Sequence, residues 1–475
     1  MANRKHLAIF VFLPAILFAQ WEEVAALNTS GAQLERQGRN VEAEELFDKA
    51  LALCEHGGAE AACPQLPAIL ANLGGIYFLT GRLPQAETTL KRAVAVAPEL
   101  GPDINILAAG LGNLAAVYRA QARFAEAAPL YERALQISEQ VPASRELRML
   151  LNNMALVFKD RGELTRAEEL AQRSLTLLAS AGASESTEAA TIFSTLSEIL
   201  REQGRIEESL EVARRSLVLR ERLLGPDAAA VAYSLNDVAM LRRIQGRLDE
   251  AGPLFVRALE ILRRTPQNPE LAAILNNLGS VRAAQGKKRE AEQLTREAIE
   301  RWERFLGPNH PNVAAGLSSL ASLEQSRGRY DEAERLLRRA QSIVERSFPP
   351  DHPRVGFALN HAGTLASDRK RYPEAEALLL RARAILEKRL PNHPEFGKVL
   401  VNLANVYRFE KKLAESEECY RHALEILAGA WGPDDQRLLA WVEQYAGVLR
   451  AREQYVEAAR ADMQAMRIRV VNTLR

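Results

Sequence analysis

Aromatic residues and net charge are both scarce in this sequence. Phenylalanine, tryptophan and tyrosine make up only 6% of the 475 residues, and the net charge is +1, from 62 basic and 61 acidic side chains. A chain with no excess of positive charge has no overall field to attract nucleic acid or an acidic membrane surface. We therefore expect no nucleic-acid partner.

Cysteine is equally rare. The three copies are Cys54, Cys63 and Cys419, an odd count whose spacing fits no zinc-binding pattern. Cys54 and Cys63 are close enough in sequence to form a disulfide if the protein is exported. The sequence favours the simpler interpretation, two unpaired small side chains at a helix end and in a loop, and leaves the pairing open.

Long hydrophobic runs are missing, with one short exception at the N-terminus. Arg4 and Lys5 precede an apolar run at 7–18, and Ala19-Gln20 follows as a candidate cleavage point. The run is too short to span a bilayer, which needs about 20 residues, but it suits a signal-peptide core. We predict a signal peptide at residues 1–19, an exported (periplasmic or secreted) protein, and no membrane span after signal removal. A cytoplasmic protein is the alternative.

The usual catalytic motifs are also missing. The sequence holds no phosphate-binding glycine loop, no His-Glu-x-x-His and no Gly-x-Ser-x-Gly. Its many carboxylates recur at the spacing of exposed helix faces, without a distinct cluster. We therefore expect no enzymatic activity, no cofactor and no metal.

What the chain does contain is a helix–turn–helix unit that recurs eleven times, which predicts an all-α fold. The turn holds a residue suited to the left-handed conformation with which helices often end, and successive turns are 40 to 43 residues apart. Seven copies have glycine there, and four have another residue: Gly38, Gly81, Gly162, Gly204, Gly246, Gly286 and Gly328, then Ala122, Lys370, Lys411 and Glu453.

Three further columns hold only glycine, alanine or serine. They lie seven residues before the turn and five and twelve residues after it, as Gly279, Ala291 and Ala298 do in the seventh copy. Small residues at these spacings let two antiparallel helices approach closely, because larger side chains would overpack the contact.

These columns resemble the tetratricopeptide repeat, and the longer spacing, against the usual 34 residues, is similar to the repeats of kinesin light chains. The resemblance implies a right-handed α-α superhelical solenoid of eleven repeats over residues 20–475. The last copy, which ends in Met-Arg-Ile-Arg-Val-Val-Asn-Thr-Leu-Arg, is expected to cap the stack. Val470 and Val471 are expected to stay exposed there.

His-Pro pairs precede three of the first helices, at His310-Pro311, His352-Pro353 and His393-Pro394. Proline is favoured in the first turn of a helix, and the histidine or the residue before it can cap that turn. Because equivalent residues of successive repeats lie on separate helix layers, we do not expect these histidines to converge on a metal ion.

The first helix of each repeat has two apolar sides. With the small residue numbered 8, positions 4, 7, 8 and 11 form one stripe, and position 10 is apolar in ten of eleven copies. The remaining arc, at positions 5, 6, 9, 12 and 13, is predicted to face the concave groove of the solenoid.

Position 6 of this arc is polar in every copy. Five copies carry asparagine there: Asn72, Asn113, Asn153, Asn277 and Asn402. An amide both donates and accepts, so such a row can bind the backbone of an extended peptide. Alternatively, each asparagine bonds within its own stack, and the sequence does not decide between the two.

Position 12 carries a basic run. Arg119, Lys159, Arg201 and Arg243 occupy it in four consecutive copies, and Arg408 and Arg450 occupy it in the last two. A basic stripe beside a polar row suits an acidic peptide or another carboxylate. The alternative is a solvated face on which each base pairs with a nearby Glu or Asp.

We therefore expect a non-enzymatic scaffold that binds a protein or an extended, acidic peptide in the groove. The alternative function is a structural or assembly factor of an envelope complex, which would act through the convex face or the solenoid ends. The sequence indicates neither the partner nor an oligomeric state.

Overall fold

The structure is a computed structural model that describes residues 7–36, 39–56, 63–97, 104–140, 145–264, 268 and 270–473. Every regular element among these residues is a helix. The chain forms two compact units, which we describe separately. Unit 1 comprises residues 1–157 and 176–181, and unit 2 comprises residues 158–175 and 182–475.

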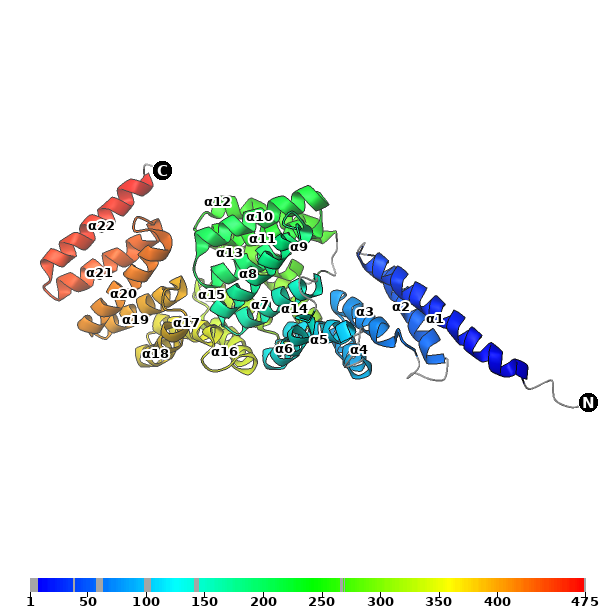
Figure 1. Ribbon diagram of the computed structural model, residues 1–475. Coiled ribbons are helices and arrows are strands. Elements are labelled where there is room, and N and C mark those ends of the chain that lie inside the picture. The colour runs from blue at the N-terminus through cyan, green and yellow to red at the C-terminus, as the bar shows by residue number, and fades with distance from the viewer. Residues whose placement is uncertain are drawn as a thin grey trace, which may run out of the picture. The chain divides into compact units, whose positions relative to one another are not determined.

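The described helices follow one another as eleven pairs, one pair for each repeat (Figure 1). The first helices are α1 (Leu7–Arg36), α3 (Leu66–Leu79), α5 (Ile104–Ala120), α7 (Arg145–Asp160), α9 (Thr187–Glu202), α11 (Ala229–Ile244), α13 (Glu270–Ala284), α15 (Pro311–Gln325), α17 (Pro353–Asp368), α19 (Pro394–Phe409) and α21 (Leu439–Ala451). The second helices are α2 (Asn40–His56), α4 (Leu83–Val96), α6 (Phe124–Ser138), α8 (Leu164–Ser180), α10 (Ile206–Leu224), α12 (Leu248–Arg263), α14 (Lys288–Leu306), α16 (Tyr330–Ser347), α18 (Tyr372–Arg389), α20 (Leu413–Trp431) and α22 (Tyr455–Thr473). A short 3₁₀ helix, η2 (Gln436–Leu438), precedes α21. The predicted all-α solenoid of eleven repeats is confirmed.

The turn inside each pair has the predicted left-handed residue. Ala122, Lys370, Lys411 and Glu453 have φ angles of 60° to 62°, beside the glycines of the other described turns. In the sixth repeat, Gly246 N–H donates to the carbonyl of Arg243, and Arg247 N–H donates to that of Arg242. These paired bonds close the helix end and set the start of the next helix. Gly38, the turn of the first repeat, lies outside the described residues.

The small-residue columns lie where the two helices of a pair touch. A methyl group on Gly279 would come within 2.7 Å of Thr295 Oγ1, and one on Gly363 within 2.8 Å of Leu379 Cγ. In the fifth repeat, serine stands both seven residues before the turn and five residues after it. The hydroxyls of these residues, Ser197 and Ser209, lie 2.9 Å apart, within hydrogen-bonding distance. Close approach therefore depends on small side chains, as predicted.

The two apolar sides of the first helices are buried. In the fourth repeat, Leu151, Met154, Ala155 and Phe158 are at most 1% exposed. Position 10 is buried in all ten copies that carry an apolar residue there: Ile76, Val117, Val157, Ile199, Leu241, Val281, Leu323, Leu365, Val406 and Val448. Only one polar arc of each first helix is left for other contacts.

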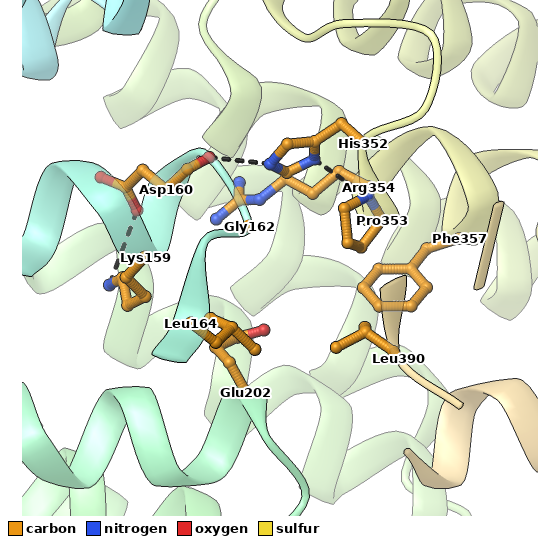
Figure 2. Close-up of a pocket in the computed structure, with 10 residues that line it drawn as sticks. All are labelled: Lys159, Asp160, Gly162, Leu164, Glu202, His352, Pro353, Arg354, Phe357 and Leu390. Atoms are coloured by element: carbon orange, nitrogen blue, oxygen red, sulfur yellow. Dashed lines mark hydrogen bonds and ion pairs between the residues drawn. The ribbon is translucent and has the colours of Figure 1, made fainter. Parts of the chain in front are cut away.

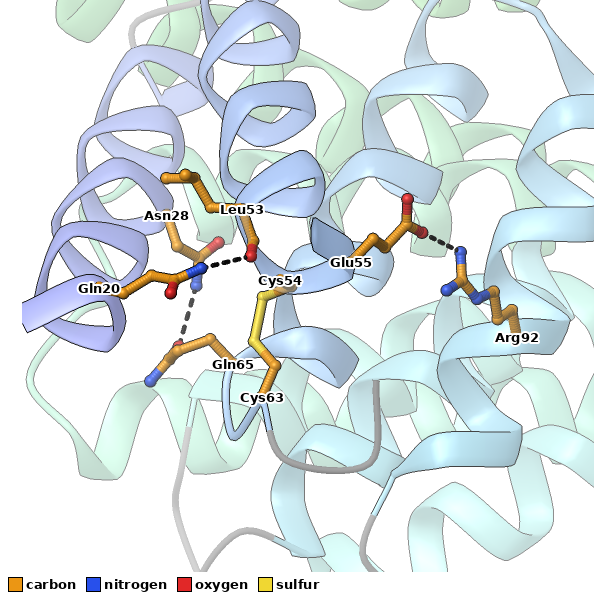
Figure 3. The surroundings of a disulfide bond; sticks show 8 residues. All are labelled: Gln20, Asn28, Leu53, Cys54, Glu55, Cys63, Gln65 and Arg92. Atoms are coloured by element: carbon orange, nitrogen blue, oxygen red, sulfur yellow. Dashed lines mark hydrogen bonds and ion pairs between the residues drawn. A yellow bond between two sulfur atoms is a disulfide. The ribbon is translucent and has the colours of Figure 1, made fainter. Parts of the chain in front are cut away.

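The cysteine pair differs from the favoured interpretation. Cys54, in the last turn of α2, is joined by a disulfide to Cys63, just before α3, with Cα atoms 5.5 Å apart (Figure 3). Asn28 Nδ2 donates to Gln65 Oε1 at 3.3 Å beside it. Both cysteines are buried in the core of the first two repeats. Packing of the first two repeats thus places Cys63 beside the end of α2, which corrects the expectation of unpaired side chains.

The predicted signal segment lies partly outside the described residues, which begin at residue 7 inside α1. From Gln20 onward this helix packs on its own repeat: Gln20 Nε2 donates to the carbonyl of Leu53 at 2.8 Å, and Val24 is fully buried. Among the described residues, no helix combines the length and hydrophobicity of a membrane span.

Candidate binding groove

The first helices of unit 2 surround one large cavity, which we call the groove. Its volume is about 1320 Å³, and its lining includes residues of every first helix from α9 to α21. Asn276 and Ser280 line it from positions 5 and 9 of the seventh repeat, and Ser318 and Ser322 from the same positions of the eighth. The polar arc that was left over by the buried stripes therefore faces this cavity.

Four of the ten predicted site residues line the groove, namely Asn277, Asn402, Arg201 and Arg243. Lys159 instead lines a separate, much smaller cavity in unit 2. Arg408 is not among the described residues that line either cavity, and its guanidinium carbon lies 4.6 Å from the ring centroid of Phe409.

The other four predicted residues belong to unit 1, so they do not contribute to the groove of unit 2. Asn72 and Asn113 lie on α3 and α5, Arg119 lies near the end of α5, and Asn153 lies on α7. Of these side chains Asn113 is exposed and the other three are half-buried.

The asparagine row bonds largely within the stack. In each of three cases the position-6 amide donates to the position-5 amide oxygen of the preceding repeat at 2.9 Å, which links neighbouring first helices. The pairs are Asn72 with Asn28, Asn277 with Asn236, and Asn402 with Asn360. These donors are used for stacking, and the second of the two interpretations holds for them.

At least three of the described position-12 bases have acidic partners, one of which is Arg450 with Asp462 at 2.6 Å. Lys159 pairs with Glu198 of the next repeat, and Arg201 pairs with its neighbour Glu202 at 2.8 Å. Arg243 differs, because its Nε is buried without a hydrogen-bond partner and none of the described ion pairs involves its guanidinium. Burial, and then repulsion from Arg201, lower the pKa of Arg243, and Glu395 offsets part of this.

The groove has an excess of basic side chains. Among the described residues that line it, six are basic and two, Glu202 and Glu395, are acidic. The six bases are Arg201, Arg243, Lys288, Arg354, Lys398 and Arg437. Glu395 accepts a hydrogen bond from Lys398 Nζ at 2.6 Å, and Glu202 pairs with Arg201, so each carboxylate already has a partner. Burial lowers the pKa of both lining histidines, His361 and His393, which favours their neutral forms.

One wall of the groove is formed by contacts between repeats five positions apart, which we call the seam. In unit 2, the turn of repeat 4 meets the start of repeat 9, that of repeat 5 meets repeat 10, and that of repeat 6 meets repeat 11. A methyl group on Gly162 or Gly204 would lie 3.2 Å from the ring Cδ of Pro353 or Pro394. At Gly246 the neighbour is Arg437, whose guanidinium donates to the carbonyl of Ile244.

The histidine before Pro353 joins both sides of the seam (Figure 2). His352 is 5% exposed, and its Nδ1 accepts the backbone N–H of Arg354 at 3.1 Å, which caps α17 as the His-Pro pattern predicted. The ring proton is therefore on Nε2, which donates to the carbonyl of Asp160 at 2.8 Å. His310 and His393 cap α15 and α19 in the same way. The small cavity beside His352, about 30 Å³, has room for roughly one or two waters.

The family model for the tetratricopeptide repeat matches this sequence in nine segments, of which the first eight overlap, at residues 22–99, 65–140, 106–180, 145–222, 188–264, 231–304, 270–343, 312–388 and 395–469. The chain belongs to the tetratricopeptide repeat family. No curated protein matches it. A solved structure that it resembles is the crystal structure of BtubC (BKLC) from P. vanneervenii, with 23% identity over 48% of this chain and 92% of that one, and a TM-score of 0.37.

Several groove residues of this tetratricopeptide repeat chain were not predicted from the sequence. Lys288, Arg354, Lys398 and Arg437 lie near or before the starts of their helices, outside the positions of the arc used for prediction. The serines of the eighth repeat lie on that arc, at positions 5, 6, 9 and 13, so the arc itself could have identified them. Lys398 is at position 2, which shares a helix face with positions 5, 6 and 9, so the arc extended by one turn could have identified it as well. The other unpredicted bases have no such signal, because only the superhelical path brings those helix starts to the groove wall.

An aromatic cluster lies at the C-terminal end of the groove in this repeat chain. Trp431 and Trp441 have ring centroids 5.9 Å apart, and the guanidinium carbon of Arg437 lies 3.9 Å from the ring of Trp431. The Nε1 donor of Trp431 is buried and has no hydrogen-bond partner. The cluster combines apolar surface with an unused donor.

Proposed function

We propose that this protein is a non-enzymatic scaffold that holds an extended, acidic segment of a partner protein in the groove of unit 2. Membership of the tetratricopeptide repeat family supports a role in protein interaction generally. The observation that carries the finer proposal is the excess of basic side chains in the 1320 Å³ groove, where both carboxylates are already paired.

Arg243 is the central residue of this proposal. A partly buried guanidinium that lacks an acidic partner and is repelled by Arg201 gains most from a carboxylate brought by a ligand. Ser318, Ser322 and Asn276 on the neighbouring helices offer hydroxyl and amide groups to the backbone of such a segment. Asn276 Oδ1 is buried without a hydrogen-bond partner, which leaves an acceptor for a peptide N–H.

The test uses a fluorescent glutamate-rich peptide and the full chain. We expect Arg243→Glu to weaken binding at least about tenfold, since charge-assisted hydrogen bonds contribute roughly 1.5–3 kcal/mol. Arg289→Glu is the matched control, because Arg289 is exposed on α14 and does not line the groove. Equal affinity of the two variants, or binding that does not weaken with added salt, would refute the proposal.

A second candidate function has its own support at the C-terminal end. The last helix, α22, exposes a row of apolar side chains that no further repeat covers in the described chain: Val456, Met463, Met466 and Val470, each more than half exposed. Exposed apolar rows of this kind mark assembly surfaces. Met463→Lys with Met466→Lys should abolish assembly and leave peptide binding intact if the protein acts as an assembly factor through this end.

We also propose that the protein is exported after removal of residues 1–19. The basic start and short apolar run support this proposal. The Cys54–Cys63 disulfide adds support, because disulfides persist mainly in oxidising compartments. N-terminal sequencing of the protein from cell fractions tests it: we expect a chain that begins at Gln20 outside the cytoplasm, and a cytosolic chain that retains Met1 would contradict it.

A further inference from the structure

The seam joins repeats 4, 5 and 6 to repeats 9, 10 and 11 of unit 2 and lies along one wall of the groove. The groove is lined from both sides of the seam, by Arg201 and Ile244 on one side and by His393 and Arg437 on the other. The contact is tight, since the gap beside His352 holds roughly one or two waters. Three successive pairs of repeats make equivalent contacts, so the seam is a repeated feature of unit 2.

We propose that the seam closes the groove into a channel, and that a groove occupant is a single extended segment which enters only when the seam opens. A folded domain or a helix pair would require the wall to part along its length. A single chain in extended form fits the channel and can stay enclosed once the wall closes around it.

The contacts that form the seam are suited to opening as a unit. Among the described residues they include two hydrogen bonds to carbonyls at helix ends, those of Asp160 and Ile244, and two prolines packed against turn glycines. None of these contacts belongs to the interior of a repeat, so all of them can break while every helix pair stays folded. In a solenoid, each repeat packs only on its neighbours, and small changes between repeats add up to a large opening.

Glycine at two of the turns serves both the seam contact and the left-handed backbone conformation of the turn. Gly162 and Gly204 have φ angles of 77° and 81°. A proline ring packs against each of them, and a Cβ atom added to either glycine would lie only 3.2 Å from that ring. By contrast, Gly286 and Gly328 have the same backbone angle with open space beside them. The His-Pro loops of repeats 9 and 10 are therefore structural partners of particular turns five repeats earlier.

The experiment compares how fast small and large thiol reagents reach a cysteine inside the groove. Ser322→Cys supplies the reporter, because Ser322 is exposed on α15 within the groove. The native cysteines interfere little: Cys54 and Cys63 are bonded, and burial raises the pKa of the Cys419 thiol to about 11. Arg289→Cys, at an exposed residue that does not line the groove, is the matched control.

We expect iodoacetamide to label both reporters rapidly. A maleimide that carries a long polyethylene glycol chain should label Ser322→Cys more than about tenfold more slowly than Arg289→Cys, since a minor open state is typically populated at roughly 0.1–10%. Adding His352→Ala, Pro394→Ala and Arg437→Ala should remove this difference while circular dichroism shows unchanged helicity.

Equal labelling of both reporters by the large reagent in the chain with an intact seam would overturn the proposal. This comparison does not depend on the seam variants, so it remains decisive if they fail to fold. It also involves no ligand. A failure of the glutamate-rich peptide to bind would therefore refute the proposed function without affecting this result, and an open groove would refute the channel without affecting peptide binding.

Discussion

The imidazole of His352 donates a hydrogen bond to the backbone carbonyl of Asp160, 192 residues earlier in the chain. The same ring accepts the N–H that caps α17, so both of its nitrogens are engaged only in the neutral form. Asp160, Glu202 and Arg354 are the charged groups that act on this imidazole. One side chain thus begins a helix and joins two turns of the superhelix.

This arrangement predicts loss of stability in acid. Burial lowers the pKa of His352 to about 4, against roughly 6.5 in the unfolded chain. Between these values the unfolded chain binds more protons, so stability is fully present above pH 6.5 and declines as the pH falls toward 4, by at most about 3 kcal/mol. Hydrogen exchange of the α17 amides at several pH values measures this loss of stability.

The control for this prediction is a substitution that keeps the cap. His352→Asn retains a side-chain acceptor for the start of α17 but cannot titrate, so it should flatten the pH dependence of exchange in α17. His310→Asn makes the same change at α15. If both variants show the same pH profile as the native chain, another group is responsible.

Because of the disulfide, we expect the stability of the first two repeats to depend on oxidation of Cys54 and Cys63. Cys54 and Cys63 close a short loop, and loop-closure entropy for such a length stabilises the folded state by roughly 2–3 kcal/mol. Cys54→Ser with Cys63→Ser should therefore increase hydrogen exchange in α1 to α3. Peptides from unit 2 provide an internal control, and uniform change across both units would contradict the prediction.

The turn residues predict opposite effects of two substitutions. Lys370 has a φ of 61°, a conformation in which a side chain costs about 1 kcal/mol, so Lys370→Gly should stabilise its repeat by roughly 0.5–1 kcal/mol. Gly286→Ala should destabilise the seventh repeat by about 1 kcal/mol through the backbone alone, because nothing lies within 4 Å of the added methyl. Urea denaturation of each variant tests both signs, and a stabilising Gly286→Ala would disprove the argument.

Replacement of one buried arginine is expected to destabilise the contact between repeats 5 and 6. Arg220 is 6% exposed and donates to Ser234 Oγ at 2.8 Å and to Ser194 Oγ at 3.2 Å. Arg220→Met keeps the apolar stem but leaves buried polar groups with fewer partners, at a cost of roughly 1–3 kcal/mol. Faster hydrogen exchange in α10 and α11 is expected. Arg214→Met, on the same helix but exposed, should have little effect.

The repeat pattern was sufficient to predict the fold because its rules are local. A left-handed turn, a small residue at each helix contact and two apolar stripes are properties of one repeat and its neighbour, and they recur in every copy. This is why Ala122 and Glu453 could be assigned to the turn without glycine, and why position 10 could be predicted to be buried.

The candidate site was predicted less well, for a physical reason. Sequence alone identified the polar arc, and Arg201, Arg243, Asn277 and Asn402 on it do line the groove. It could not show that Lys159 is paired with Glu198, because that contact crosses between repeats and depends on side-chain conformation. The disulfide has the same origin, since it depends on how the first two repeats pack together.

By itself, the sequence determined the helices, the turns, the number of repeats and the face of each first helix that stays polar. Only the tertiary structure decided that His352, Pro394 and Arg437 meet turns five repeats earlier, and that residues near helix starts supply four of the six basic side chains described in the groove lining. The reason is that a repeat sequence encodes the geometry between neighbours, whereas the meeting of distant repeats results from the sum of many small rotations.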